Sequence, residues 1–156
     1  MVHVGSVIEI EAPPERVREV FLDFPNLPQW TTFFKSITVV GPKQPMELAK
    51  GDNVKVDFGN MTMTAPIEAN TPRLFKWAGG MWWLFLGVHS FSFEPSKTTP
   101  GGTTFTNSEE FTGPMSFTML KMKPFFGQQT ETNFEKVCHD LKKRVESLEA
   151  AKSGAQ

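Results

Sequence analysis

Tyrosine is absent from this chain of 156 residues, and cysteine occurs once, at Cys138. A single thiol excludes an internal disulfide. No apolar run approaches the roughly 20 residues that a membrane-spanning helix needs, and the longest, around residues 80–88, is interrupted by glycine. The first residues, MVHVGSVIEIE, also lack the cationic flank and apolar core of a secretory signal. We therefore expect a cytoplasmic protein without stable membrane insertion.

An excess of charge of either sign is missing as well. The 16 basic and 17 acidic residues give a net charge of −1, which offers no general attraction for phosphate, so we expect no nucleic-acid partner. His3, His89 and His139 are scattered, and neither a CxxC nor an HExxH pattern occurs. The paired glycines at 79–80 and 101–102 indicate turns rather than a phosphate-binding loop. We expect no metal and no other cofactor.

The chain is rich in apolar side chains that carry no hydroxyl group. It has 15 Phe, 8 Met and 4 Trp, which supply bulk and adaptable shape. An interior lined by them has few hydrogen-bonding groups, so any ligand specificity has to come from a small number of polar side chains. Composition alone leaves open the alternative that these residues simply fill a core.

Residues 84–113 are the most informative stretch, because polar and aromatic residues alternate there with the period of two of half-buried strands. In the first run the inner face carries Phe85, His89, Phe91 and Phe93. In the second it carries Phe105, Asn107, Glu109 and Phe111. Three polar side chains, His89, Asn107 and Glu109, therefore share an otherwise aromatic face.

The turn-forming residues 95–102 join these two runs into a predicted antiparallel hairpin. Two registers keep the same side chains inward. A turn centred near residues 97–98 places His89 opposite Asn107, whereas a two-residue slip places His89 opposite Glu109. Opposed side chains lie roughly 5 Å apart and diagonal ones roughly 7 to 8 Å, so either register brings the three polar residues together.

The remaining pattern predicts one domain over residues 1–150 and a flexible tail over 151–156. Strands are expected at 2–11, 34–40, 53–59, 61–70 and 73–78, and two short helices follow the first strand. A long helix over 128–150 has one apolar stripe, formed by Phe134, Val137, Cys138, Leu141, Val145 and Leu148. Cys138 is thus expected to be a core residue rather than a nucleophile. Residues 79–83 interrupt the strand pattern and either cover a cavity mouth or pack on the sheet edge.

This order of elements indicates an α+β fold in which one curved, seven-stranded antiparallel sheet wraps around the long C-terminal helix. The ordered combination of several segments resembles the START-like or SRPBCC superfamily with the helix-grip fold, in its polyketide cyclase/dehydratase-like branch. The resemblance spans about residues 2–148 and is carried by residues 8–15 (IEIEAPPE), 27–30, 50–52 (KGD), 91–95 (FSFEP), 101–103, 109–113 (EEFTG) and 141–145.

The resemblance implies a deep apolar cavity between sheet and terminal helix, which relatives use for lipids, sterols, hormones or polyketides. Some relatives also catalyse cyclisation, dehydration or hydrolysis there, but the superfamily shares no fixed catalytic set. The expected cavity would be lined mainly by apolar groups with few polar anchors. The anchors are His89, Asn107 and Glu109, and the walls are Phe58, Met61, Met63, Phe75, Trp77, Phe85, Phe91, Phe105, Phe111, Met115, Phe117 and Phe134.

Three functions stay open at this stage. The first is binding of a small hydrophobic molecule, lipid-like or polyketide-like. The second is a cofactor-independent cyclase, dehydratase or hydrolase, in which His89 oriented by Glu109 acts as a general base and Asn107 donates a hydrogen bond to a substrate carbonyl. The third is an interaction module resembling co-chaperones of this fold. The polar trio also has a purely structural interpretation, as a buried network, and both monomer and homodimer are open.

Overall fold

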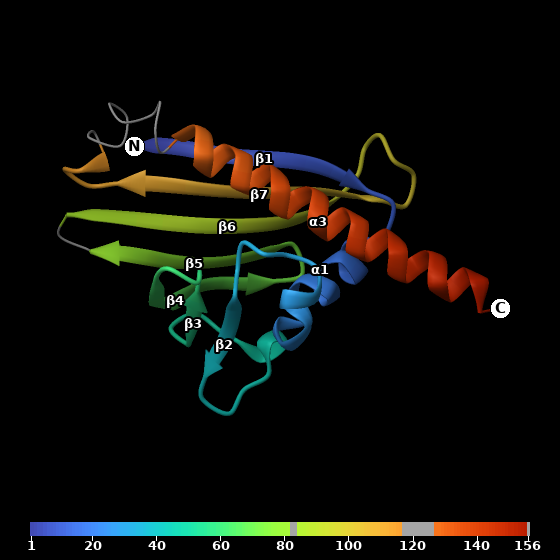
Figure 1. Cartoon of the computed structure of the whole chain (residues 1–156), viewed down its shortest axis with the longest axis horizontal. Coiled ribbons are helices and arrows are strands. Elements are labelled where there is room, and N and C mark those ends of the chain that lie inside the picture. The colour runs from blue at the N-terminus through green and yellow to red at the C-terminus, as the bar shows by residue number, and fades with distance from the viewer. Residues whose placement is uncertain (82–83, 117–126, 156) are drawn as a thin grey trace.

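The computed structural model describes residues 1–81, 84–116 and 127–155, without the side chains of residues 81, 85 and 127–129 (Figure 1). In chain order, the elements are β1 (Val2–Ile10), α1 (Pro14–Leu22), the 3-10 helix η1 (Phe24–Gln29), β2 (Ser36–Val40), the 3-10 turn η2 (Pro45–Glu47), β3 (Asn53–Asp57), β4 (Thr62–Thr71), β5 (Leu74–Met81), β6 (Phe85–Pro95), β7 (Thr103–Thr112) and α3 (Gly127–Gly154).

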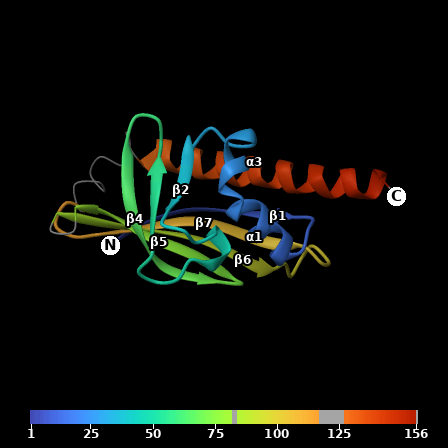
Figure 2. The ribbon, with the colours of Figure 1, turned by 90° about the horizontal axis from the view of Figure 1, so that it is seen from below.

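The strands of the described residues form one seven-stranded sheet in the order β1-β7-β6-β5-β4-β3-β2. Every pairing is antiparallel. Figure 2 shows β2 and β4 rising from the plane of β6 and β7 on the side where α3 lies, so the sheet curves around the helix. A register shift between Ile67 and Ala69 falls in β4, and such bulges bend a strand. The predicted helix-grip α+β fold is confirmed.

The long hairpin of β6 and β7 adopts the second of the two predicted registers. His89 lies opposite Glu109, and Pro95 pairs with Thr103. The turn between them is closed by the bond from the Ser96 amide to the carbonyl oxygen of Gly102, at 2.9 Å. The Ser96 hydroxyl also accepts from the amide of Thr99 at 2.8 Å. These bonds centre the turn near Thr99 rather than at residues 97–98.

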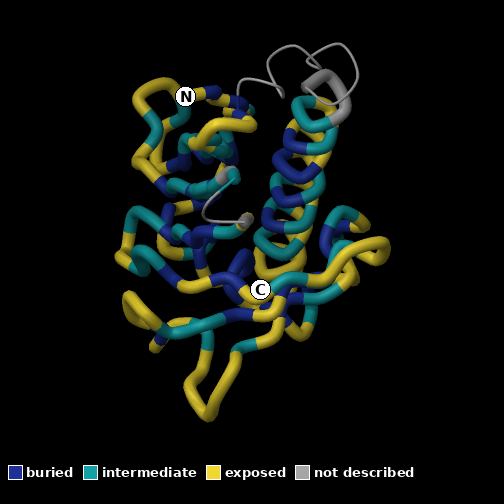
Figure 3. Tube along the Cα trace, turned by 90° about the vertical axis from the view of Figure 1, so that its left-hand side faces the viewer, coloured by how far each residue is buried: buried dark blue, intermediate teal, exposed yellow. Residues whose placement is uncertain are grey.

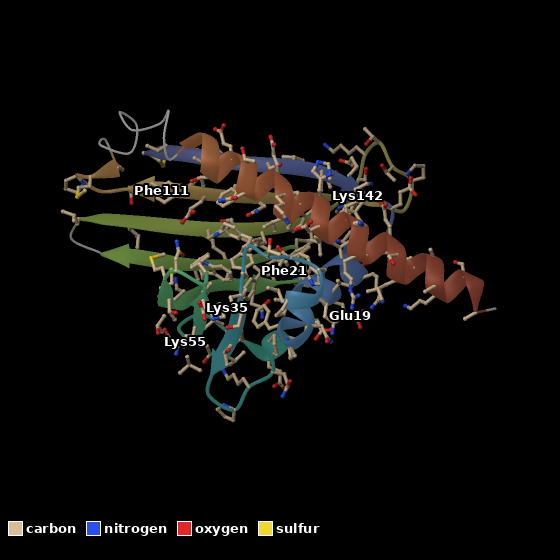
Figure 4. The ribbon with its side chains drawn as sticks, viewed as in Figure 1. Glu19, Phe21, Lys35, Lys55, Phe111 and Lys142 are labelled. Atoms are coloured by element: carbon tan, nitrogen blue, oxygen red, sulfur yellow. The ribbon has the colours of Figure 1, made fainter. Side chains whose placement is uncertain are left out.

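The main core lies between the sheet, α1 and the middle of α3. Phe21 of α1 belongs to it (Figure 4). Its ring centroid lies 4.4 Å from that of Phe91 and 6.1 Å from that of Phe75. A second, smaller cluster lies toward the start of α3. It consists of Val2, Val4 and Phe134, with Phe33 and Phe111 packed against them. The interior therefore has two apolar clusters, one at each end of the long strands.

Helix α3 buries the predicted stripe. Phe134, Val137, Cys138, Leu141 and Val145 are buried, and Figure 3 shows the buried positions of the helix toward the sheet. The helix also bonds the backbone of β1, because the Lys142 ammonium donates to the carbonyl oxygen of Glu9 at 2.7 Å. It continues to Gly154, four residues beyond the predicted end at Ala150. None of the helices in the described part of the chain is long and apolar enough to span a membrane.

Two sequence predictions about the sheet were wrong. Met61 was expected to face inward, but its side chain is 56% exposed, because it lies in the turn before β4, where its carbonyl oxygen accepts from the Phe58 amide at 2.8 Å. The strand pattern was expected to end at Ala78, yet β5 continues to Met81, with Gly79 paired to Gly87. The backbone can pair through glycine although no side-chain alternation marks it. The neighbouring residues 82–83 lie outside the described part.

Candidate functional site

The structure brings the three predicted polar side chains to the inner face of β6 and β7. His89 and Asn107 are buried, with 4% and 0% of their surface exposed. They lie diagonally across the two strands, and 2.6 Å separates the imidazole Nε2 from the amide Oδ1. Glu109 lies directly opposite His89 in the strand register and is partly buried. No hydrogen bond joins His89 to Glu109 among the described residues, so Asn107 is the partner of the imidazole.

Aromatic rings enclose His89. Its ring stacks on Phe91 at a centroid distance of 4.3 Å and on Phe134 of α3 at 4.9 Å, and Trp77 meets it edge-on at 5.5 Å. Burial lowers the pKa of His89 to about 4, although the hydrogen bond to Asn107 opposes this shift. The imidazole is therefore neutral at pH 7. With Nε2–H donating to Asn107, the other ring nitrogen, Nδ1, carries no proton.

Asn107 has one satisfied and one unsatisfied end. Its carbonyl oxygen accepts from His89, which fixes the amide so that Nδ2 points away from the imidazole. That nitrogen is buried and has no hydrogen-bond partner within the described residues. An orphaned buried donor costs about 1 to 3 kcal/mol, and such a group in a native protein indicates an unassigned water, ion or ligand.

Glu109 lies over Gly87. A Cβ atom added at Gly87 would come within 2.6 Å of the carboxyl Oε1 and 3.2 Å of the Phe111 ring, so only glycine leaves room for this carboxyl. Across the described residues the carboxyl has neither a cationic partner nor a hydrogen-bond donor. Burial raises the pKa of Glu109 to about 7. The group can therefore hold or release a proton near neutral pH.

The predicted wall residues divide into groups. Phe75, Trp77, Phe91, Phe105 and Phe134 are buried, and Phe58, Met63 and Phe111 are partly buried. Met61 and Met115 are 56% and 41% exposed, so the structure does not place them on the wall. Met115 follows Pro114 in the turn after β7, where its amide donates to the Leu84 carbonyl at 3.1 Å. Phe117 and the side chain of Phe85 lie outside the described residues.

Helix α1 already covers part of the predicted wall. Phe21 lies 4.4 Å from Phe91 and 6.2 Å from Phe105, centroid to centroid. This end of the interior is therefore packed, and the candidate site is restricted to the other end, between His89 and the cluster around Phe134. The sequence analysis did not anticipate this because Phe21 lies far away in the chain.

Two further aromatic residues adjoin the site and were missed. Phe33 lies 6.2 Å from Phe134, and Phe34 lies 6.5 Å from His89, between ring centroids. The pair follows the η1 segment, and the signal was two adjacent phenylalanines at the start of the strand predicted over residues 34–40. They connect the polar trio to both apolar clusters.

Two surface pockets in the described part of the chain lie elsewhere. One, of about 270 Å³, is lined by α1, η1 and α3, and the other, of about 460 Å³, runs beside β2. The cavity next to the polar trio stays a prediction. Within the described ranges no group of three His, Cys, Asp or Glu side chains could hold a metal ion. Cys138 is buried, and desolvation raises its pKa to about 11, which leaves it unreactive as a thiol.

Comparison with known proteins identifies the family. Residues 1–146 match the family described as polyketide cyclase / dehydrase and lipid transport. The chain belongs to this family. Among curated proteins none matches the chain.

Solved structures support the same fold for this polyketide cyclase family member. A START superfamily protein from Mycobacterium smegmatis is similar at a TM-score of 0.68 and 17% identity, over 94% of this chain and 98% of that one. A Thermus thermophilus protein is similar at a TM-score of 0.66 and 16% identity, over 94% of this chain and 99% of that one. A point mutant of Thalictrum norcoclaurine synthase, in complex with a transition-state analogue, is similar at a TM-score of 0.65 and 13% identity. The match covers 95% of this chain and 96% of that one. The family match and these structures together indicate a START-like fold for this chain.

Proposed function

We propose that the chain binds a small hydrophobic molecule, lipid-like or polyketide-like, between α3 and the inner face of β5, β6 and β7. The observation that carries this proposal is the buried Nδ2 of Asn107, which has no hydrogen-bond partner among the residues that the structure describes. An apolar ligand with one hydrogen-bond acceptor would satisfy that donor and leave its remaining surface to the aromatic rings. The family, which includes lipid transport in its description, supports the same class of ligand.

The energetic argument follows from the two ends of the Asn107 amide. His89 already bonds one end of the amide at 2.6 Å. Turning the amide over, with the imidazole in its other tautomer, would only replace the orphaned donor Nδ2 by an orphaned acceptor Oδ1. A ligand oxygen at Nδ2 would recover the cost of about 1 to 3 kcal/mol, which corresponds to roughly 5- to 150-fold in affinity. Phe134 contacts the site from α3, so displacement of this ring would admit the ligand without disturbing the sheet.

A fluorescence titration with N-phenyl-1-naphthylamine, a neutral apolar probe, tests the proposal. We expect saturable binding with a stoichiometry of one, and competition by flat hydrophobic ketones. Asn107→Leu should lower the affinity for the ketones by at least fivefold. The affinity for the probe should change by no more than about threefold. The matched control is Thr106→Val, a neighbour on the opposite face of β7. If no saturable uptake occurs, the binding function is wrong and the interaction module becomes the better candidate.

A second candidate is acid–base catalysis of the cyclase, dehydratase or hydrolase type, and the environment of Glu109 favours it. The pKa of this carboxyl is raised to about 7 by burial, which is close to the value that suits a general base at neutral pH. His89 is less suitable because its pKa is lowered to about 4 and its Nε2 is engaged with Asn107. In this candidate Glu109 takes a proton from the carbon next to a carbonyl that Asn107 holds.

Deuterium exchange at the methyl group of 2-acetylnaphthalene, followed by NMR in D₂O, tests the catalytic candidate. Glu109→Gln should abolish exchange above the buffer rate while the affinity for the fluorescent probe changes by less than tenfold. Glu110→Gln, on the exposed face of the same strand, is the control and should exchange like the wild type. An equal rate in the Glu109→Gln variant contradicts the catalytic role, and binding without any exchange leaves binding as the function.

A further inference from the structure

The sheet has two edge strands, and the structure treats them differently. Helix α3 packs on β1 and reaches its backbone, because the Lys142 ammonium donates to the Glu9 carbonyl at 2.7 Å. At the other edge, β2 pairs with β3. No other described residue bonds the backbone of residues 36–40. An open strand edge of this kind presents unpaired backbone donors and acceptors.

A groove of about 460 Å³ runs along this open edge. One wall is β2 itself, from Ser36 to Val39, and the facing wall carries Phe24, Pro25 and Pro28. Proline lacks a backbone N–H, so the two prolines offer apolar rings and few competing hydrogen bonds. The groove thus combines a row of backbone groups on one side with an apolar wall on the other.

We propose that this groove binds an extended peptide segment of another protein, which adds an eighth strand next to β2. In strand addition, backbone hydrogen bonds supply affinity and alternate side chains supply specificity. Five residues of β2 at roughly 3.3 Å each give an edge of about 17 Å, which matches a peptide of five or six residues. Its apolar side chains would face the two prolines, since Phe24 itself is buried in the core.

Charge complementarity defines one more feature of the peptide. Asp23 lines the groove and accepts a hydrogen bond from the Asn26 amide at 2.7 Å, and no cation of the described part pairs with it. The other charged residue on the wall, Lys43, is neutralised by Asp52 at 2.6 Å. The groove therefore has one uncompensated negative charge, and a lysine or arginine at one end of the peptide would meet it.

A free peptide segment suits this groove better than a second copy of the chain. The β2 edge lies between two walls, η1 on one side and residues 43–45 at the end of the groove. A second copy has the same two walls beside its β2 strand. The walls of the two copies would collide before the two β2 strands could pair as neighbours. A single extended segment meets no such obstruction.

Hydrogen exchange followed by NMR, with the blocked peptide acetyl-KVTVTV-amide as the probe, tests the proposal. At saturating peptide we expect exchange of the alternate β2 amides that point away from β3 to slow at least tenfold, with no change in β1. The same peptide N-methylated at alternate residues retains the side chains but loses backbone donors, and we expect it to bind at least tenfold more weakly. Asp23→Asn should lower the affinity for the lysine peptide two- to fivefold, as expected for an exposed ion pair. It should leave the affinity for an analogue with norleucine in place of lysine unchanged.

Each contrary outcome overturns a defined part of this proposal. No binding at millimolar peptide, or protection confined to β1, refutes the site. Equal affinity for the N-methylated peptide shows that the groove takes apolar side chains without strand addition. Self-association of the protein without peptide, with protection of β2, identifies a second copy as the occupant and refutes the peptide.

Discussion

Replacing Glu109 by glutamine should stabilise the protein at alkaline pH and have little effect at acidic pH. In the folded chain, burial raises the pKa of this carboxyl from its ordinary value of 4.5 to about 7. The folded state therefore retains a proton that the unfolded chain has released, and stability falls as the pH rises from 4.5 through 7. Glutamine removes the titration and keeps the shape of the side chain.

The magnitude follows from the same two pKa values. At about 1.4 kcal/mol per pKa unit, the ionised carboxyl costs the folded state about 3 kcal/mol once the pH exceeds 8. At pH 5 most of this cost is absent. The advantage of the Glu109→Gln variant over the wild type should accordingly grow by about 2 to 3 kcal/mol between pH 5 and pH 8.5.

Urea denaturation at both pH values measures this difference directly. Glu110→Gln is the matched control, since Glu110 lies on the exposed face of the same strand, and its difference from the wild type should not change with pH. Parallel pH profiles for wild type and Glu109→Gln would refute the reasoning, because they would show that the carboxyl is solvated or paired in the folded state.

Three other predictions concern the neighbourhood of the site. The pKa of His89 falls from 6.5 to about 4 in the fold. The wild type should therefore lose stability relative to His89→Gln as the pH falls from 6.5 through 4, which is the reverse of the Glu109 effect. Urea titrations at pH 4 and 7 measure this difference. Gly87→Ala should lower the free energy of unfolding by about 1 to 3 kcal/mol, because the added Cβ would lie 2.6 Å from the Glu109 carboxyl. Gly154→Ala, whose Cβ would have nothing within 4 Å, is the control and should not destabilise the protein. Equal midpoints of the two variants in thermal denaturation would contradict the close contact. Cys138, 1% exposed and with its pKa raised to about 11, should resist iodoacetamide at pH 8 until urea unfolds the chain, and rapid labelling of the native protein would show that α3 opens.

The sequence allowed the inward-facing residues of β6 and β7 to be predicted because side-chain alternation is a local property. It could not decide the register, since a slip of two residues keeps His89, Asn107 and Glu109 on the same face. The bonds of Ser96 within the turn make that choice. The stripe of α3 was likewise readable from its spacing.

Packing between distant segments was not readable in the same way. Nothing near Phe91 in the chain indicates that Phe21 of α1 lies 4.4 Å from it, and so the sequence assigned Phe91 to a cavity wall. Met61 was misassigned because alternation was continued through the turn that follows Gly59, where the backbone has a φ of 91°. The chemistry of the trio also depends on a contact that no pattern contains, the 2.6 Å bond between His89 and Asn107.

The most direct test of ligand binding at the polar trio is a set of intermolecular nuclear Overhauser effects between bound N-phenyl-1-naphthylamine and the protein. We predict cross-peaks from the probe to the ring protons of His89 and Phe134 and to the side-chain amide of Asn107. Saturable binding with cross-peaks confined to the groove between β2 and η1, and none to these three residues, would contradict the account.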